Sequence, residues 1–212
     1  MENKSIINKS PCNQNTQKCH FPYSKNPRDP IYECCKSHLF ELLSYIISVF
    51  EMYNIEYFLD YGSLLGCVRN NSFIPWDDDI DIAVIDNGNN SELIEKAMIY
   101  ILNNDKNYHC KKNDNPSLTS SWYRLLYSIY NILHIDICVK KINKDNNYLD
   151  HFCDRHNWSI NKTELFPLKR VKFDKILVKI PNKSKTYLKR LYGENCIDEV
   201  QTRGNKYDWE EY

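Results

Sequence analysis

The chain has 212 residues, which is enough for one domain with a sizeable hydrophobic core. Its 28 basic and 28 acidic residues leave a formal net charge of zero, so no global field favours nucleic acid or an anionic membrane surface. Hydrophobic residues at 42% and aromatic residues at 13% exclude an intrinsically disordered chain and indicate a folded globule.

No stretch approaches the roughly 20 apolar residues that a membrane span requires. The first residues, MENKSIINKSPCNQ, lack the apolar centre of a secretion signal. We therefore expect a soluble chain that has no membrane span and works in the cytoplasm. In that setting, metal ligation or buried thiols explain the nine cysteines better than a disulfide framework does.

Residues 1 to about 31 are polar and predict irregular structure. Four cysteines lie in or just after this segment, namely Cys12, Cys19, Cys34 and Cys35. They supply the number of thiolates that a tetrahedral structural zinc needs. The spacing is not one of the usual zinc-finger spacings, and His20 and His38 are spare ligands. From the pattern alone, four unligated thiols stay open beside zinc.

From Tyr32 to about Asn54 the apolar residues recur with helical spacing and predict a long amphipathic helix. A short core strand is predicted from Tyr57 to Leu59. It is followed by a turn at Gly62-Ser63 and a helix from Ser63 to Asn70. The glycine permits close backbone approach, and the serine can cap the helix, whose free N–H groups attract phosphate.

An acidic strand follows Pro75, and in it Asp79 and Asp81 are separated by one residue. Side chains two apart on a strand project from the same face, so both carboxylates point one way while Ile80 and Ile82 enter a core. Crowded carboxylates repel each other, and a divalent cation such as Mg²⁺ removes that cost.

Three other interpretations of this acidic run need weighing. A solvated loop is the bland alternative. A calcium loop would need glycine and glutamate where Ile82 and Gly88 stand, so that interpretation fails. A D-x-D of the sugar-nucleotide glycosyltransferase kind stays open, because such a pair also holds a metal against a diphosphate.

Farther along, a helix is predicted from Ser91 to about Asn103, and strands from Trp122 to Ile129 and from Ile132 to Lys140. In the second strand His134, Asp136 and Cys138 share one face. We interpret His134 as a neighbour of the site rather than a ligand. Arg124, on the adjacent strand, is a candidate to face phosphate.

The segment from Asp145 to Lys162 is polar and aromatic and is interpreted as a loop or lid. After it, Val171 to Phe173 and Ile176 to Ile180 predict a hairpin. Pro181 ends the hairpin, and a helix capped by Ser184 is predicted to end at Gly193.

The run G-S-L-L-G-C-V-R followed by F-I-P-W-D-D-D-I-D-I, from Gly62 to Ile82, resembles the signature of the LicD family of the nucleotidyltransferase fold. That family includes bacterial phosphocholine transferases, fukutin and fukutin-related protein. The resemblance implies an α/β (α+β) fold, with a nucleotidyltransferase-like mixed central sheet flanked by helices. It also implies that Asp79 and Asp81 form the metal-binding pair, that Gly62-Ser63 belongs to the nucleotide-phosphate loop, and that Asp136 is the third carboxylate, from a neighbouring strand.

Arg69 stands where the family motif has a characteristic arginine, which implies a contact with substrate phosphate or with one of the aspartates. The resemblance also implies an N-terminal cysteine-rich loop upstream of the catalytic core, with a closing Cys-Cys pair, that binds structural zinc. The zinc ligands would be Cys12, Cys19, Cys34 and Cys35. Residues 1–36 would then be an arm with the zinc loop, and residues 37–212 the catalytic domain.

The implied activity is a Mg²⁺- or Mn²⁺-dependent transferase that moves a phospho-alcohol group from a CDP-linked donor to a glycan or glycoconjugate hydroxyl, releasing CMP. The group would be a polyol phosphate, such as ribitol phosphate, or phosphocholine. Asp136 would hold a second metal, accept the hydroxyl proton, or both. Two alternatives stay open: a nucleotide-sugar glycosyltransferase, and an inactive relative that binds nucleotide or glycan. The sequence does not define an oligomeric state.

Overall fold

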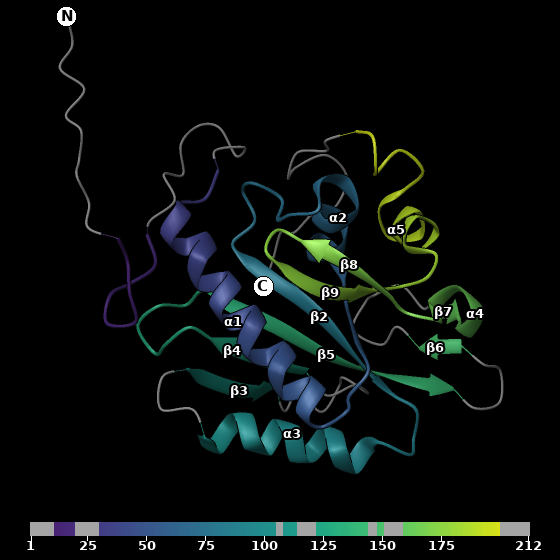
Figure 1. Ribbon diagram of the computed structural model, residues 1–212, viewed down its shortest axis with the longest axis horizontal. Coiled ribbons are helices and arrows are strands. Elements are labelled where there is room, and N and C mark those ends of the chain that lie inside the picture. The colour runs from purple at the N-terminus through teal and green to yellow at the C-terminus, as the bar shows by residue number, and fades with distance from the viewer. Residues whose placement is uncertain are drawn as a thin grey trace, which may run out of the picture.

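A computed structural model describes residues 11–19, 30–104, 108–113, 122–143, 148–150 and 159–199 of the chain. The central sheet contains β1 (Tyr57–Leu59), β2 (Asp79–Asp86), β3 (His109–Asn113), β4 (Trp122–Leu126) and β5 (His134–Asn143). These strands lie in the order β1–β2–β5–β4–β3 (Figure 1). β2 and β5 are parallel, whereas β1, β4 and β3 run antiparallel to their neighbours, so the sheet is mixed as expected.

The sheet is extended by two strands in the segment interpreted as a loop or lid. β6 (Tyr148–Asp150) pairs with the end of β5, and β7 (Ser159–Asn161) pairs with β6. The loop interpretation of residues 145–162 was therefore wrong for these two stretches. Three-residue strands carry too little alternation to be recognised locally, and pairing with the long β5 determines them.

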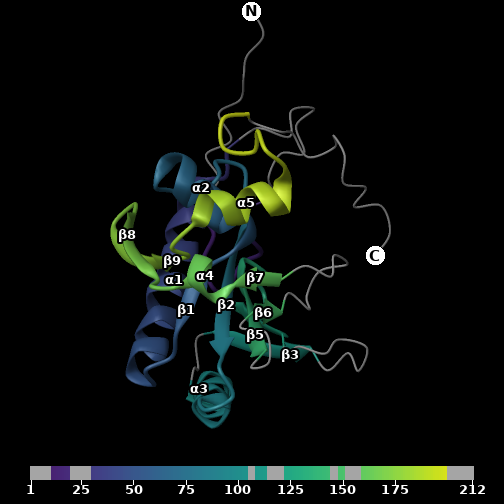
Figure 2. The ribbon, with the colours of Figure 1, turned by 90° about the vertical axis from the view of Figure 1, so that its right-hand side faces the viewer.

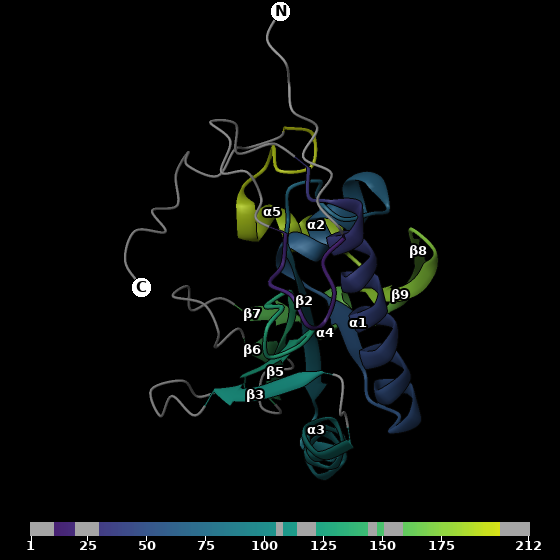
Figure 3. The same ribbon diagram turned by 90° about the vertical axis from the view of Figure 1, so that its left-hand side faces the viewer.

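The helices are α1 (Glu33–Met52), α2 (Tyr61–Asn70), α3 (Ser91–Asn104), α4 (Lys162–Leu165) and α5 (Ser184–Tyr192), and a separate hairpin is formed by β8 (Lys169–Phe173) and β9 (Ile176–Ile180). In Figure 1 α1 lies across one face of the sheet. The side views place α3 at one end of the molecule and α2 beside α5 at the other (Figures 2 and 3). The apolar positions of α1 are buried, among them Leu39, Leu43, Ile46 and Phe50.

The start of α2 differs from the prediction. Asp60, not Ser63, is the N-cap residue, and its side chain accepts a hydrogen bond from the backbone N–H of Tyr61 at 2.9 Å. Gly62 and Ser63 consequently lie in the first turn of the helix rather than in a turn before it. A β-carbon on Gly66 would lie 2.5 Å from the carbonyl oxygen of Ser72. The second glycine therefore allows α2 to pack against the chain that leads to β2.

Beneath this helix start lies a buried charged network. Asp60 and Lys140 have side chains that are 1% and 0% exposed, and the Lys140 ammonium pairs with the Asp60 carboxylate. The Tyr187 hydroxyl donates to the same carboxylate at 2.5 Å. Because a buried charge is costly unless it is paired, this network ties β5 and α5 to the amino end of α2.

Candidate active site

The parallel pairing of β2 and β5 brings the predicted carboxylates together. Asp79 is the register partner of His134, and Asp81 is the register partner of Asp136. Side chains in register on parallel strands share a face, so these four residues occupy one face at the amino ends of the two strands. Ile80, Ile82, Ile135 and Ile137 alternate with them and are buried in the core.

The clustered carboxylates are strained electrostatically. Desolvation raises the pKa of Asp81 well above its ordinary value, and the like charges of Asp79 and Asp77 raise it further. The Asp81 carboxylate is enclosed although the residue keeps some exposed surface. Burial also raises the pKa of Asp79, with His134 acting in the opposite direction. A bound cation would relieve both effects.

Asp77 also belongs to this cluster, a role that the sequence pattern did not predict. Oxygens of Asp77, Asp78 and Asp79 come within 4.8 Å of one another. A β-carbon on Gly62 would lie 2.6 Å from Asp77 Oδ2 and 3.8 Å from Asp81 Oδ2. The glycine therefore leaves room for the carboxylates, which is a second use of the Gly-Ser pair. The sequence feature that could have indicated this role is the unbroken acidic run Asp77-Asp78-Asp79.

Ser63 also contributes through its side chain. Its hydroxyl oxygen accepts a hydrogen bond from the backbone N–H of Asp81 at 2.9 Å. The backbone N–H of Asp60 in turn donates to the Asp81 carbonyl at 3.0 Å. Both contacts fix the start of α2 against β2, so the Gly62-Ser63 segment and the acidic strand form one rigid unit.

Arg124 on β4 is the register partner of Asp136 and forms a bidentate pair with it. Nε donates to Oδ1 at 2.7 Å and a terminal nitrogen donates to Oδ2 at 2.8 Å. The guanidinium also lies over the Trp122 ring, 4.7 Å from its centroid. This pair places one fixed positive charge at the edge of the carboxylate cluster.

The structure places Arg69 elsewhere. Its guanidinium donates to the backbone carbonyls of Cys196 and Glu199, which follow α5. In this arrangement Arg69 holds the segment after α5 against α2. Its contact with substrate phosphate stays a prediction.

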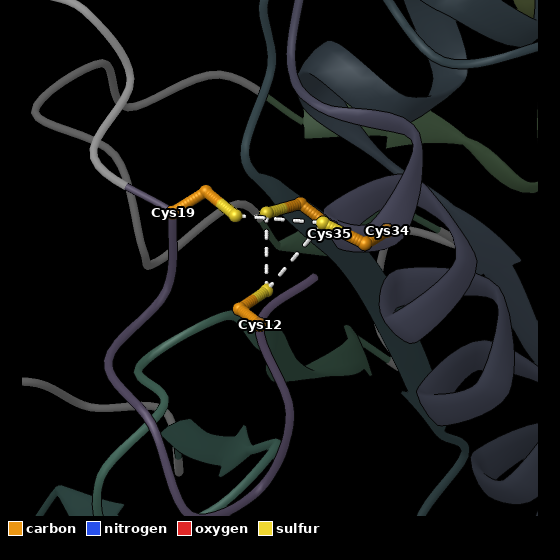
Figure 4. A group of neighbouring side chains, drawn as sticks. All are labelled: Cys12, Cys19, Cys34 and Cys35. Carbon is orange, nitrogen blue, oxygen red and sulfur yellow. Dashed lines mark hydrogen bonds between the residues drawn. The ribbon is translucent and has the colours of Figure 1, made fainter. Parts of the chain in front are cut away.

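The four N-terminal cysteines converge on one point (Figure 4). The sulfur–sulfur distances are 3.4 Å for Cys19–Cys34, 3.6 Å for Cys12–Cys35 and 3.7 Å for Cys12–Cys34. Zinc–sulfur bonds of about 2.3 Å in a tetrahedron separate the sulfurs by roughly 3.8 Å, so this thiol set fits a metal of that size. Burial and the Cys34 thiol raise the pKa of Cys19 to about 11, and a metal would displace that proton.

Of the spare histidine ligands, His20 lies outside the described residues. His38 contacts the Cys12 carbonyl through Nε2 at 2.7 Å and stacks on Tyr127, so it buttresses the cluster rather than joining it. Because α1 already begins at Glu33, a boundary between residues 36 and 37 would fall inside this helix. The two-part division of the chain stays a prediction.

The cysteine segment also contacts the site. The Lys18 ammonium pairs with the Asp78 carboxylate, within the acidic run. The backbone carbonyl of Asn13 accepts a hydrogen bond from the Asn131 side chain at 3.1 Å.

Cys138 on β5 is disulfide-bonded. This cysteine is an exception to the expectation that the cysteines bind metal or stay as buried thiols.

Comparison with known proteins defines the class to which this fold and site belong. The family described as LicD/FKTN/FKRP, nucleotidyltransferase domain, matches residues 54–183, which include α2, the acidic strand and β5. The chain belongs to this family. The match spans all the residues of the proposed aspartate site.

Two curated relatives illustrate the likeness. Human ribitol 5-phosphate transferase FKRP is 26% identical over 201 residues, covering 90% of this chain and 39% of the relative. Lipopolysaccharide cholinephosphotransferase LicD of Haemophilus influenzae is 49% identical over 41 residues, which is 19% of this chain and 16% of the relative. The chain thus spans about two fifths of the length of the FKRP relative.

Among solved structures, the lincomycin-bound lincosamide antibiotic adenylyltransferase LnuA aligns over 82% of this chain and 100% of its own, with a TM-score of 0.47 and 15% identity. Within the described part of the chain, every helix is too short or too polar to cross a lipid bilayer.

Proposed function

We propose that the chain is a metal-dependent phosphotransferase that moves a phospho-alcohol group from a CDP-linked donor to a hydroxyl of a glycan or glycoconjugate. The observation that carries this proposal is the parallel register that sets Asp79, Asp81 and Asp136 on one face beside the first turn of α2. Membership of the LicD/FKTN/FKRP family supports it, as do relatives named as transferases of ribitol 5-phosphate and phosphocholine.

The residues fit a hard divalent cation. Carboxylate oxygens are the ligands that Mg²⁺ and Mn²⁺ prefer, and burial and mutual repulsion raise the pKa values of Asp79 and Asp81. Asp79, Asp81 and Asp136 would hold the metal. When bound, such a cation neutralises charge on the diphosphate and on the departing nucleotide.

The chain's own residues would divide the remaining work. The acceptor hydroxyl oxygen attacks the distal phosphorus of the donor, and the bond from that phosphorus to the bridging oxygen breaks. CMP leaves with the bridging oxygen, and a phosphodiester forms. We propose Asp136 as the group that accepts the hydroxyl proton. Gly62 and Ser63 would face the donor phosphates at the amino end of α2, where backbone N–H groups favour anions. Arg69 is proposed as a further phosphate contact if the segment after α5 releases it.

We base the proposed identity of the transferred group on the longer of the two sequence matches. The FKRP match extends over 201 residues, whereas the LicD match covers 41 residues. We therefore place a polyol phosphate such as ribitol phosphate before phosphocholine as the transferred group.

A structural zinc at Cys12, Cys19, Cys34 and Cys35 completes the proposed cofactors. The sulfur–sulfur distances of 3.4–3.7 Å support it. Zinc there would fix the loop whose Lys18 pairs with Asp78 in the acidic run. The metal would thus act on the shape of the site rather than on the reacting atoms.

The test is release of CMP from a panel of CDP-linked alcohols, namely CDP-ribitol, CDP-glycerol and CDP-choline, with a glycan acceptor and Mg²⁺ or Mn²⁺. We expect CMP and a phosphodiester product from at least one donor. Asp81→Ala should lower turnover by on the order of 10³-fold, the scale of lost transition-state charge stabilisation. Full activity in a folded Asp81→Ala protein would overturn the assignment. Release of a nucleoside diphosphate from sugar nucleotides would point to glycosyl transfer instead.

A further inference from the structure

His134 lies on the same face of β2 and β5 as the three aspartates, but the proposed function gives it no role. It lies at the start of β5, with a side chain that is 16% exposed. Nδ1 lies 2.9 Å from the carbonyl oxygen of Ile132. A carbonyl can only accept, so Nδ1 carries a proton and donates. The tautomer and the ring orientation are therefore fixed by the backbone.

The other ring nitrogen faces the carboxylates. Nε2 is buried and has no hydrogen-bond partner among the described residues. It lies 3.7 Å from Asp79 Oδ2 and 3.7 Å from Asp136 Oδ1. With Nδ1 protonated, a neutral ring directs the Nε2 lone pair at two acceptor oxygens. Asp136 Oδ1 also accepts from Arg124 Nε, but Nε2 has no donor among the described residues. A cation placed between Nε2 and the two carboxylates would bind all three groups at once.

A proton does not explain this geometry as well as a metal does. A protonated imidazole would approach one carboxylate to about 2.7–2.9 Å, the distance of a charge-assisted hydrogen bond. Nε2 is instead equally distant from one oxygen of each aspartate. Donor atoms around a small divalent ion lie roughly 3 Å apart when each bond is about 2.1 Å. Small side-chain rotations would close the gap.

We propose that His134 is a metal ligand, which binds through Nε2 together with Asp79 and Asp136. Donation from Nδ1 to a backbone carbonyl is the usual support of a metal-bound histidine. An imidazole beside two carboxylates shifts the preference of the site from Mg²⁺ toward Mn²⁺ and other transition ions. This inference rests on the metal site of the proposed function and makes it specific to one nitrogen.

The direct test is spectroscopic and needs no turnover. Mn²⁺ bound to the full chain is examined by electron spin-echo envelope modulation, with histidine labelled with ¹⁵N in a second sample. We expect a nitrogen coupling of directly bound imidazole that changes with the label and disappears in His134→Gln. His109→Gln, on β3, is the control and should keep it. Mn²⁺ bound without a nitrogen coupling in the wild-type chain would overturn the proposal.

Titration calorimetry gives a second readout. In His134→Gln the Mn²⁺ affinity should fall by at least about tenfold, the scale at which losing even a supporting residue weakens a metal site. The Mg²⁺ affinity should change less, so the preference for Mn²⁺ shrinks. An unchanged ratio of the two affinities would contradict the proposal. If Mn²⁺ binds without nitrogen coupling while CMP release is intact, His134 is not a metal ligand but the proposed transferase function stands. If nitrogen coupling is seen but no CMP is released from any donor, His134 is a metal ligand and the proposed transferase function fails.

Discussion

Arg124 and Asp136 are cross-strand partners joined by two hydrogen bonds, of 2.7 and 2.8 Å. The fixed guanidinium therefore competes with a metal for the same carboxylate. Removing it should raise metal affinity, although it also removes the charge predicted from the sequence to face phosphate.

We expect Arg124→Gln to bind Mg²⁺ or Mn²⁺ about fivefold more tightly. This is the equivalent of roughly 1 kcal/mol, the upper range for a partly exposed ion pair. Turnover should fall in the same variant. Calorimetry and CMP release measure the two effects separately. Arg170→Gln is the control, because it breaks an exposed pair between the hairpin and Glu51 of α1, and it should change neither. Weaker metal binding by Arg124→Gln would contradict this account.

Asp81 should make the metal-free protein less stable. Its pKa is raised in the folded chain by desolvation and by neighbouring carboxylates. Between the ordinary aspartate pKa of about 3.9 and that raised value, the unfolded chain releases the proton more readily, so stability falls as the pH rises. Without Mg²⁺ or Mn²⁺, Asp81→Asn should therefore melt at a higher temperature than the wild type at neutral pH.

Each kcal/mol gained corresponds to about 2–4 °C for a chain of this length. Added Mg²⁺ should stabilise the wild type and leave Asp81→Asn nearly unchanged, because the variant lacks one ligand charge. Melting curves across pH 4–8, with the exposed Asp198→Asn as control, give the measurement. A lower melting temperature for metal-free Asp81→Asn would count against a repulsive carboxylate cluster.

The buried ion pair of Lys140 and Asp60 should contribute strongly to the stability of the fold. Lys140→Met removes the cation from the enclosed Asp60 carboxylate and leaves it, among the described residues, the Tyr187 hydroxyl and the Tyr61 N–H as hydrogen-bond donors. We expect a loss of about 3–5 kcal/mol in the free energy of unfolding, the usual cost of breaking a buried pair. Urea denaturation measures it. The exposed neighbour Lys141→Met should cost little, and a double Asp60→Asn/Lys140→Met variant should recover part of the loss. Equal stabilities for the two lysine variants would refute this role.

The cysteine cluster should hold one zinc ion per chain. Elemental analysis of purified protein should find this stoichiometry, and Cys34→Ser should lose it together with thermal stability, because zinc binding contributes to folding. Cys110→Ser, at a free cysteine on β3, should retain zinc. If purified protein contains no stoichiometric zinc, the zinc assignment is wrong and the four cysteines are a cluster of packed thiols.

Local patterns were sufficient where one segment determines its own structure. The strand Tyr57–Leu59 and the helix from Ser91 follow from short apolar runs and their periodicity. Alternation along β5 likewise placed His134 and Asp136 on one face. The start of α2 was misjudged because Asp60, directly after the strand, caps the helix before Ser63 is reached.

What the sequence could not provide is register. That Asp79 lies beside His134, and Arg124 beside Asp136, depends on how β2, β5 and β4 align, and distant residues set that alignment. For the same reason the motif predicted that Arg69 contacts substrate phosphate or an aspartate. It could not show that the guanidinium donates to the backbone carbonyls of Cys196 and Glu199, far along the chain. Asp77 was missed because its role depends on the space left by Gly62.

The most direct test of the whole account is diffraction at the manganese absorption edge, from crystals of the full chain grown with Mn²⁺ and CDP. We predict an anomalous peak coordinated by Asp79, Asp81 and Asp136, with the diphosphate of CDP beside the first turn of α2. Manganese bound only elsewhere, or an empty face between β2 and β5 in crystals that contain CDP, would contradict it.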